Sequence, residues 1–178
     1  MRPRNSAILL ALLLVSLIPE AQAKKPKADV YFGYSRAGAN LYDVYTPAIN
    51  GWQLAMHIKP LPFVGVEGDI SRYTQNIRGF SQQVTLVMFG PRVTVRAAGF
   101  SLFAHGLAGD AHQNATVTIY PPVGYDATSY ALGGGGDIPL ILGFKLRITG
   151  DYLGNSNAPP SSYSPSHYRV GAGLAYHF

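Results

Sequence analysis

The 178-residue chain contains no cysteine, few charged residues (13%) and a single tryptophan. Without cysteine, neither a disulfide framework nor a thiolate metal site can form, so packing, hydrogen bonds and ion pairs have to stabilise the fold. The chain also has no long apolar run after residue 23. This argues against a helical membrane protein, because a membrane-spanning helix needs about 20 consecutive apolar residues.

The first 23 residues are predicted to form a cleaved signal peptide. Arg2 and Arg4 precede an uncharged, apolar-rich run at 7–18, Pro19 breaks it, and residues 21–23 have the small-x-small pattern of a cleavage site. An uncleaved amphipathic anchor is the alternative, which the absence of a polar face disfavours. We expect a short basic tail at 24–27 and one domain at 28–178, beyond the inner membrane.

The last stretch, 166–178, alternates with a period of two. One face carries only aromatic and aliphatic side chains, and the other carries small or charged ones. The apolar face comprises Tyr168, Val170, Ala172, Leu174, Tyr176 and Phe178. A transmembrane β-strand needs about 9–11 residues, an apolar face and aromatic residues near the membrane interfaces. This stretch meets all three requirements.

Further alternating segments, bounded by turn residues, occur at 29–36, 49–59, 63–73, 81–95, 100–110, 126–137 and 140–153. Short connections near 60–62, 96–99 and 138–140 alternate with longer polar ones near 37–48, 74–80, 111–125 and 153–165. Such asymmetry is typical of outer-membrane barrels. The sequence predicts an all-β, eight-stranded antiparallel up-and-down transmembrane β-barrel. A soluble lipocalin-like barrel is the alternative, and it would place the apolar face inside.

The alternation also assigns side chains to the two faces, although the continuous apolar run at 86–89 leaves the fourth and fifth strands ambiguous. Charges that point into a barrel must pair with one another, because an isolated buried charge is costly. We therefore expect an ion network in the lumen, formed by Glu67, Asp69, Arg92, Asp137, Lys145, Arg147, Asp151 and Arg169. The predicted lipid-facing side chains are Trp52, Leu54, Met56, Phe144, Leu146 and Leu174.

The order and spacing of several motifs resemble the OmpA/opacity-type family of small outer-membrane β-barrels, a porin family. The motifs are Gly90-Pro91-Arg92, Phe103-Ala104-His105 with Gly109, and the segments 132–137, 145–152 and 169–178. The resemblance covers about residues 28–178 and implies an outer-membrane location. It also implies that Tyr176 and Phe178 belong to a signal similar to that read by the barrel-assembly machinery.

These observations favour a non-enzymatic barrel with a structural or surface role and a plugged lumen. The open alternatives are a small porin-like channel, an adhesin acting through the loops 111–125 and 153–165, a lipid-modifying enzyme and a soluble binder. No histidine is followed two residues later by serine, so His112 with Asp110 is the best acid–base candidate. No catalytic residue, metal site or cofactor is predicted.

The expected partners are outer-membrane lipid, the barrel-assembly machinery and an extracellular ligand of the loops. Nucleic acid is not expected, because the basic residues form no block beyond Lys24-Lys25-Pro26-Lys27. The protein is expected to be a monomer.

Overall fold

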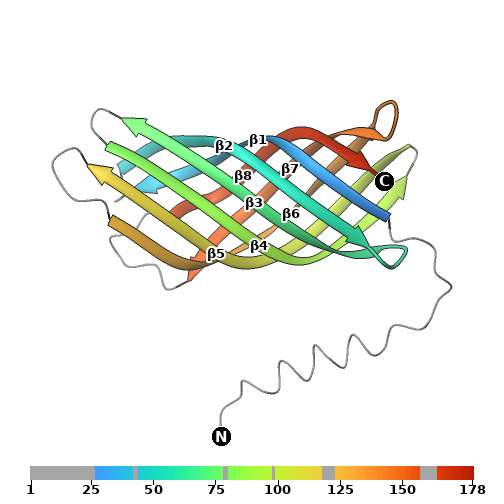
Figure 1. Ribbon diagram of the computed structural model, residues 1–178, viewed down its shortest axis with the longest axis horizontal. Helices are drawn as coiled ribbons and strands as arrows, with labels where there is room; N and C mark the ends of the chain where they lie inside the picture. The colour runs from blue at the N-terminus through green and yellow to red at the C-terminus, as the bar shows by residue number, and fades with distance from the viewer. Residues whose placement is uncertain (1–26, 42–43, 78–79, 98, 118–122, 157–163) are drawn as a thin grey trace, which may run out of the picture.

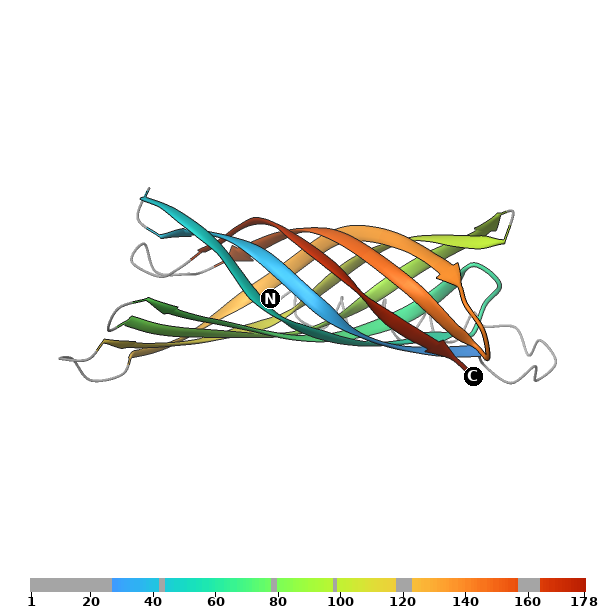
Figure 2. The same cartoon turned by 90° about the horizontal axis from the view of Figure 1, so that it is seen from above.

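The chain forms a single closed barrel of eight antiparallel strands (Figures 1 and 2). A computed structural model describes residues 27–41, 44–77, 80–97, 99–117, 123–156 and 164–178. Each strand pairs with the next, and β8 pairs with β1 to close the barrel. The strands are β1 (Lys27–Leu41), β2 (Val44–Lys59), β3 (Val64–Ile77), β4 (Phe80–Ala97), β5 (Phe100–Val117), β6 (Val123–Pro139), β7 (Phe144–Ser156) and β8 (Ser164–His177). The predicted fold class is confirmed; the predicted signal peptide lies outside the described residues.

The period-two alternation that predicted the strands separates an outer wall from a lumen. In β8, Leu174 and Tyr176 are exposed on the wall, whereas Ala175 between them is fully buried. The same alternation holds along β2, where Leu54 and Met56 face outward and Gln53 and His57 face inward. The described part of the chain contains no helix long and apolar enough to cross a membrane.

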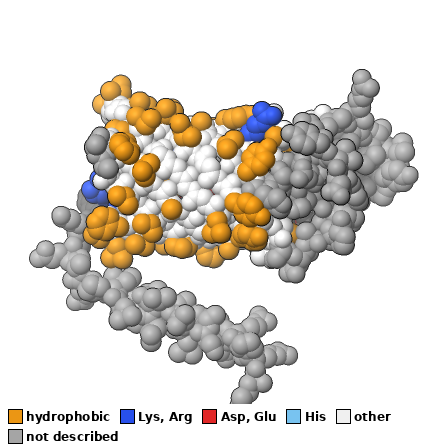
Figure 3. All heavy atoms as spheres, turned by 180° about the vertical axis from the view of Figure 1, so that it is seen from behind, with side chains coloured by type: hydrophobic (Ala, Val, Ile, Leu, Met, Phe, Trp, Pro, Cys, Tyr) orange, Lys and Arg blue, Asp and Glu red, His pale blue; other side chains and the backbone are white. Residues whose placement is uncertain are grey.

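The outer wall is apolar over most of the barrel. In Figure 3, hydrophobic side chains surround a central area of backbone and other side chains on the visible wall, and no acidic side chain is seen there. All six side chains predicted to face lipid lie on this wall, with exposed fractions from 36% at Leu146 to 51% at Leu174. Soluble monomers rarely expose so large a continuous apolar surface. The wall therefore suits a hydrocarbon environment, and the lipocalin-like alternative with its apolar face inside does not fit.

The two ends of the barrel differ. The end at which β1 begins and β8 finishes, here called the terminal end, also carries the turns 60–63, 98–99 and 140–143 (right in Figure 1). At the opposite end, here called the distal end, β1, β3, β5 and β7 finish and β2, β4, β6 and β8 begin. Phe144 and Tyr176 pack together near the terminal end, with ring centroids 5.0 Å apart.

Strands extend into all four connections predicted at the distal end. The prediction of a long connection at 37–48 is wrong, because β1 runs to Leu41 and β2 begins at Val44. The same applies at 111–125, where β5 runs to Val117 and β6 begins at Val123, and at 74–80 and 153–165, into which the flanking strands also extend. The polar composition of these strand ends indicates that they no longer carry a lipid-facing apolar side. It does not interrupt backbone pairing, which continues as far as Leu41 opposite Val44.

At the terminal end the corrections are smaller. The turn predicted at 138–140 lies at 140–143, so β7 begins at Phe144 and not at Leu140. Leu142 and Gly143 have φ angles of 55° and 84°. Those left-handed conformations reverse the chain, although the local sequence is apolar. β1 begins at Lys27, the last residue of the predicted basic tail.

An arginine at Ile148 is expected to destabilise the barrel in a lipid bilayer. Ile148 faces outward in β7, four residues from each of the outward-facing aromatic residues Phe144 and Tyr152. This places it near the middle of the apolar wall, where an arginine costs about 2–4 kcal/mol. Urea unfolding in phospholipid vesicles would measure the loss. Thr74→Arg, at an exposed site near the distal end, is the control; an equal loss in both variants would contradict the placement of the wall in lipid.

Candidate functional site

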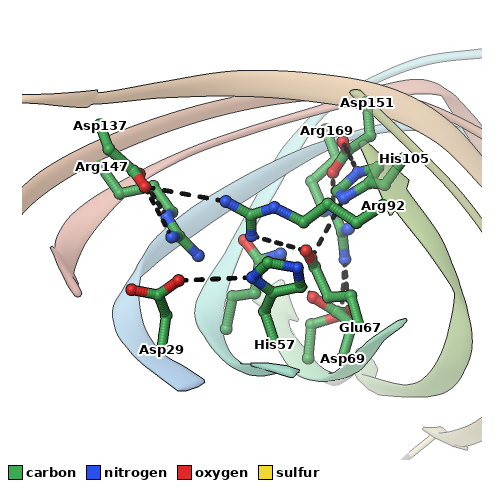
Figure 4. Close-up of polar contacts among 12 residues, drawn as sticks. Asp29, His57, Glu67, Asp69, Arg92, His105, Asp137, Arg147, Asp151 and Arg169 are labelled. Atoms are coloured by element: carbon green, nitrogen blue, oxygen red, sulfur yellow. Dashed lines mark hydrogen bonds and ion pairs between the residues drawn. The ribbon is translucent and has the colours of Figure 1, made fainter. Parts of the chain in front are cut away.

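The lumen contains a continuous chain of ion pairs (Figure 4). Glu67 on β3 stands at its centre. One of its carboxylate oxygens accepts a hydrogen bond from Arg92 Nη1 at 2.7 Å, and the other lies 3.1 Å from His105 Nδ1. Arg92 also approaches Asp137, with Nη2 and Oδ2 3.7 Å apart.

From Asp137 and from His105 the chain continues in two directions. Arg147 donates two hydrogen bonds to Asp137, at 2.6 and 2.9 Å, in the forked geometry typical of a guanidinium with a carboxylate. On the other side, His105 Nε2 lies 2.7 Å from Asp151. The side chains of these residues are almost fully buried.

Arg169 completes the chain. It donates to Asp151 at 2.6 Å and to Asp69 at 2.8 Å, so one guanidinium on β8 joins carboxylates on β7 and β3. Gln53 donates a further hydrogen bond to Asp69. We call the following eight residues, which come from six strands, the lumen network: Glu67, Asp69, Arg92, His105, Asp137, Arg147, Asp151 and Arg169.

His105 has to be protonated in this arrangement. Both of its ring nitrogens face carboxylate oxygens, and a neutral imidazole has only one N–H to donate. With His105 charged, the lumen network holds four positive and four negative groups and is neutral as a whole. Neutrality matters, because each uncompensated charge in such a site costs several kcal/mol.

A second, smaller cluster surrounds Asp29 near the terminal end. Its carboxylate lies 2.9 Å from Lys145 Nζ, 3.3 Å from His57 Nδ1 and 2.9 Å from His177 Nδ1. Lys145, which the sequence placed in one network with the other lumen charges, therefore pairs in this separate cluster. The other seven predicted lumen residues all belong to the lumen network.

Aromatic rings and glycines support the arginines. The Arg92 guanidinium lies over the Phe103 ring, 3.6 Å from its centroid, and Arg147 lies 5.1 Å from the same ring. The lumen side of β6 offers room because it carries glycines there. A Cβ on Gly135 would meet the Phe103 ring, and one on Gly133 would meet the Asp151 carboxylate.

On the distal side of the lumen network an apolar cluster lies in the interior, beside the buried polar side chains of Ser35, Gln82 and Ser129. We call this layer the apolar plug; it comprises Ala37, Ile49, Tyr73, Val84, Leu86, Met88, Leu107, Ala111, Ala131 and Leu153. Its largest members are no more than 2% exposed. The lumen therefore holds two layers, one charged and one apolar, and both are packed.

Sequence reasoning missed the apolar plug and several polar members of the lumen. The run at 86–89 is continuously apolar because Leu86 and Met88 point into the lumen while Val87 and Phe89 face outward. This run was the one signal in the sequence that could have predicted the apolar plug. Asp29 and His57 were recognisable by their places on the small, polar faces of their strands. His105 was not, because the face of its strand was ambiguous.

His112, which together with Asp110 was the best acid–base candidate in the sequence, has another acidic partner in the structure. His112 Nδ1 instead lies 2.5 Å from Asp126 on the neighbouring strand β6. Both side chains are well exposed, at 55% and 83%. Parts of the two loops predicted for adhesion, 118–122 and 157–163, lie outside the described residues.

The barrel is similar to several solved structures. Ail, the attachment invasion locus protein of Yersinia pestis, matches with a TM-score of 0.63 and 16% identity, over 86% of this chain and 99% of that chain. Neisserial surface protein A matches with a TM-score of 0.68 and 9% identity, over 85% and 97%. The N-terminal β-barrel domain of Pseudomonas aeruginosa OprF matches with a TM-score of 0.56 and 14% identity, over 88% and 100%. The chain has the fold of a small outer-membrane β-barrel.

At these identities the similarity establishes the fold and nothing finer. It confirms the resemblance found in the sequence, because the matching proteins are small outer-membrane barrels. No protein-family model matches the sequence, and no curated protein matches it.

Removing Arg169 should destabilise this barrel strongly. Arg169→Met leaves Asp69 and Asp151 buried without their shared cation, and breaking such a pair costs about 3–5 kcal/mol. A lower free energy of unfolding in lipid vesicles would show this loss of stability. The control is Arg72→Met, because Arg72 is exposed on the outer face of β3; surface changes of this kind stay within about 0.5 kcal/mol. Equal stability of the two variants would mean that the lumen network does not hold the barrel together.

Proposed function

We propose that the protein is a closed, non-enzymatic barrel of the outer membrane, with its surface role at the distal end. The observation that carries the proposal is the filling of the lumen by two packed layers inside an apolar wall. An eight-stranded barrel has an interior just wide enough to be filled by side chains. In this chain the described interior uses that space for ion pairs and for aliphatic and aromatic groups.

The same observation argues against the porin-like alternative. A permeating ion would have to displace buried arginine–carboxylate pairs and then cross the apolar plug. Constrictions lined by hydrophobic side chains exclude water and block conduction. The charges of the lumen network compensate one another, so they offer no excess charge of one sign to attract a solute.

The burial of the lumen charges also argues against catalysis. The acids, arginines and histidine of the lumen network bind one another, and their side chains are almost inaccessible. A catalytic group has to reach its substrate. Within the described ranges, no serine or threonine hydroxyl hydrogen-bonds to the exposed pair of His112 and Asp126.

The proposed orientation places the terminal end in the periplasm and the distal end outside the cell. Small outer-membrane barrels have short periplasmic turns and longer external segments, and here the distal strands extend past the apolar wall. Outer-membrane lipid would surround the wall of a monomer. Tyr176 and Phe178, which face outward beside each other with ring centroids 5.9 Å apart, would form the signal for the barrel-assembly machinery.

Attachment through the distal end is a second candidate. Ail is named for attachment and invasion, and one of its structures is a complex with the heparin analogue sucrose octasulfate. In this chain Arg36 and Arg72 are exposed near the distal end. They would offer positive charge to an extracellular anionic ligand, together with the predicted loop segments 111–125 and 153–165.

Closure of the lumen predicts that the folded protein does not conduct ions. Purified protein in planar lipid bilayers should give no steady unit conductance, whereas a large-pore porin in the same bilayer should. Folding would be checked first by gel mobility, because a closed barrel migrates faster before boiling than after. Regular conductance steps from the folded protein would contradict the proposal.

The proposed orientation predicts the labelling of single cysteines in intact cells. The chain has no cysteine of its own, so Ile141→Cys in the terminal-end turn and Asn76→Cys near the distal end each give one reactive site. A membrane-impermeant maleimide should label the cysteine at 76 in intact cells and the cysteine at 141 only after the outer membrane is permeabilised. The reverse pattern would invert the orientation.

A further inference from the structure

The terminal end of the lumen opens into a cavity of about 390 Å³, within the size range of small-molecule sites. We call this cavity the vestibule. It is lined by Lys27, Lys59, Thr94 and Arg96 together with the turn residues 60–63. It lies between the starts and ends of β1 to β4, on the lumen side of Thr94.

The vestibule has an excess of positive charge. Its lining contains three cations and no carboxylate. None of the three forms an ion pair with any described residue, whereas the nearby Lys145 pairs with Asp29. The nearest acids are therefore already engaged, Asp29 in its cluster and Asp137 with Arg147.

The register of the sheet holds two of these cations against each other. Lys27 on β1 lies directly opposite Lys59 on β2. Like charges at directly opposed positions destabilise an antiparallel pair. A bound anion would remove this repulsion, so the arrangement costs stability when the vestibule is empty of anions and gains it when one binds.

A buried hydroxyl provides a second, independent sign of a ligand. Thr94 lines the vestibule and is only 7% exposed, and its Oγ1 has no hydrogen-bond partner among the described residues. Buried hydroxyl groups nearly always have a partner. Rotation about the Cα–Cβ bond would turn this hydroxyl toward an acceptor in the vestibule without breaking any existing hydrogen bond.

We propose that the vestibule binds a small polyanion that carries phosphate or carboxylate groups. Arg96 offers the planar fork that suits both groups, Lys59 and Lys27 add point charges, and Thr94 adds a neutral donor. Leu61 and Phe63, which are exposed in the same turn, form an apolar lip for the remainder of the ligand. On the orientation proposed above, the ligand comes from the periplasm.

Calorimetric titration of the folded full-length barrel in detergent micelles tests this. The two probes are sodium pyrophosphate and sodium malonate, each at constant ionic strength set by chloride. Saturable binding of pyrophosphate alone would assign the site to phosphates, and of malonate alone to carboxylates; either result supports the proposal. Saturable binding of neither probe would overturn it.

A matched pair of double variants separates the vestibule from general surface charge. Lys59→Gln with Arg96→Gln should weaken binding at least about tenfold, because each charge-assisted hydrogen bond contributes about a factor of ten. Thr74→Glu with Asn76→Glu lowers the net charge by the same amount at exposed positions near the distal end and should leave the affinity unchanged. Thr94→Val, which keeps the shape and removes the hydroxyl, should give a smaller loss. Equal weakening by both double variants would overturn the site.

The result does not depend on whether the barrel conducts. A conducting protein that still binds the anion at Lys59 and Arg96 would refute only the closed lumen. A non-conducting, correctly folded protein that binds neither probe would refute only the vestibule site.

Discussion

The structure depends on the compensation of charge among buried side chains in the lumen. Eight strands enclose a lumen filled by side chains, so an inward-facing charge cannot keep its hydration shell. Every arginine and carboxylate of the lumen network consequently meets a partner from another strand. The protonated His105 brings the total to neutrality, because it bridges two carboxylates that the arginines alone do not balance.

The outer wall and the lumen exchange the usual roles of surface and core. Aliphatic and aromatic side chains face outward, and most of the described polar groups face inward. The apolar plug is the exception, and it lies on the distal side of the lumen network. A barrel that needed only to fold in lipid could fill its interior with ion pairs throughout. With an apolar layer as well, the proposed closure of the lumen would not depend on any single ion pair.

The sequence predicted the fold well because strand alternation is a local property. Charged residues at every second position identified the inward faces of β3, β7 and β8, and the structure places Glu67, Arg147 and Arg169 there. The sequence could not predict which acid pairs with which base. Partners such as Arg169 and Asp69 are 100 residues apart, and their contact depends on the stagger of the strands in the closed barrel. The distal strand ends were predicted too short because polar residues pair through the backbone as well as apolar ones do. The vestibule likewise depends on a register that places Lys27 opposite Lys59.

The ion pairs of Arg169 can form only when the last strand joins the sheet. Arg169 lies on the last strand, yet it neutralises carboxylates on β3 and β7 from the middle of the lumen. In a sheet still lacking β8, Asp69 and Asp151 would have no arginine and would hold water between the strands. Dehydration of the lumen is thus coupled to the pairing of β8 with β1. A barrel that is nearly complete remains wet inside, and one that has closed becomes dry, so assembly should end in a single cooperative step and not in a gradual tightening.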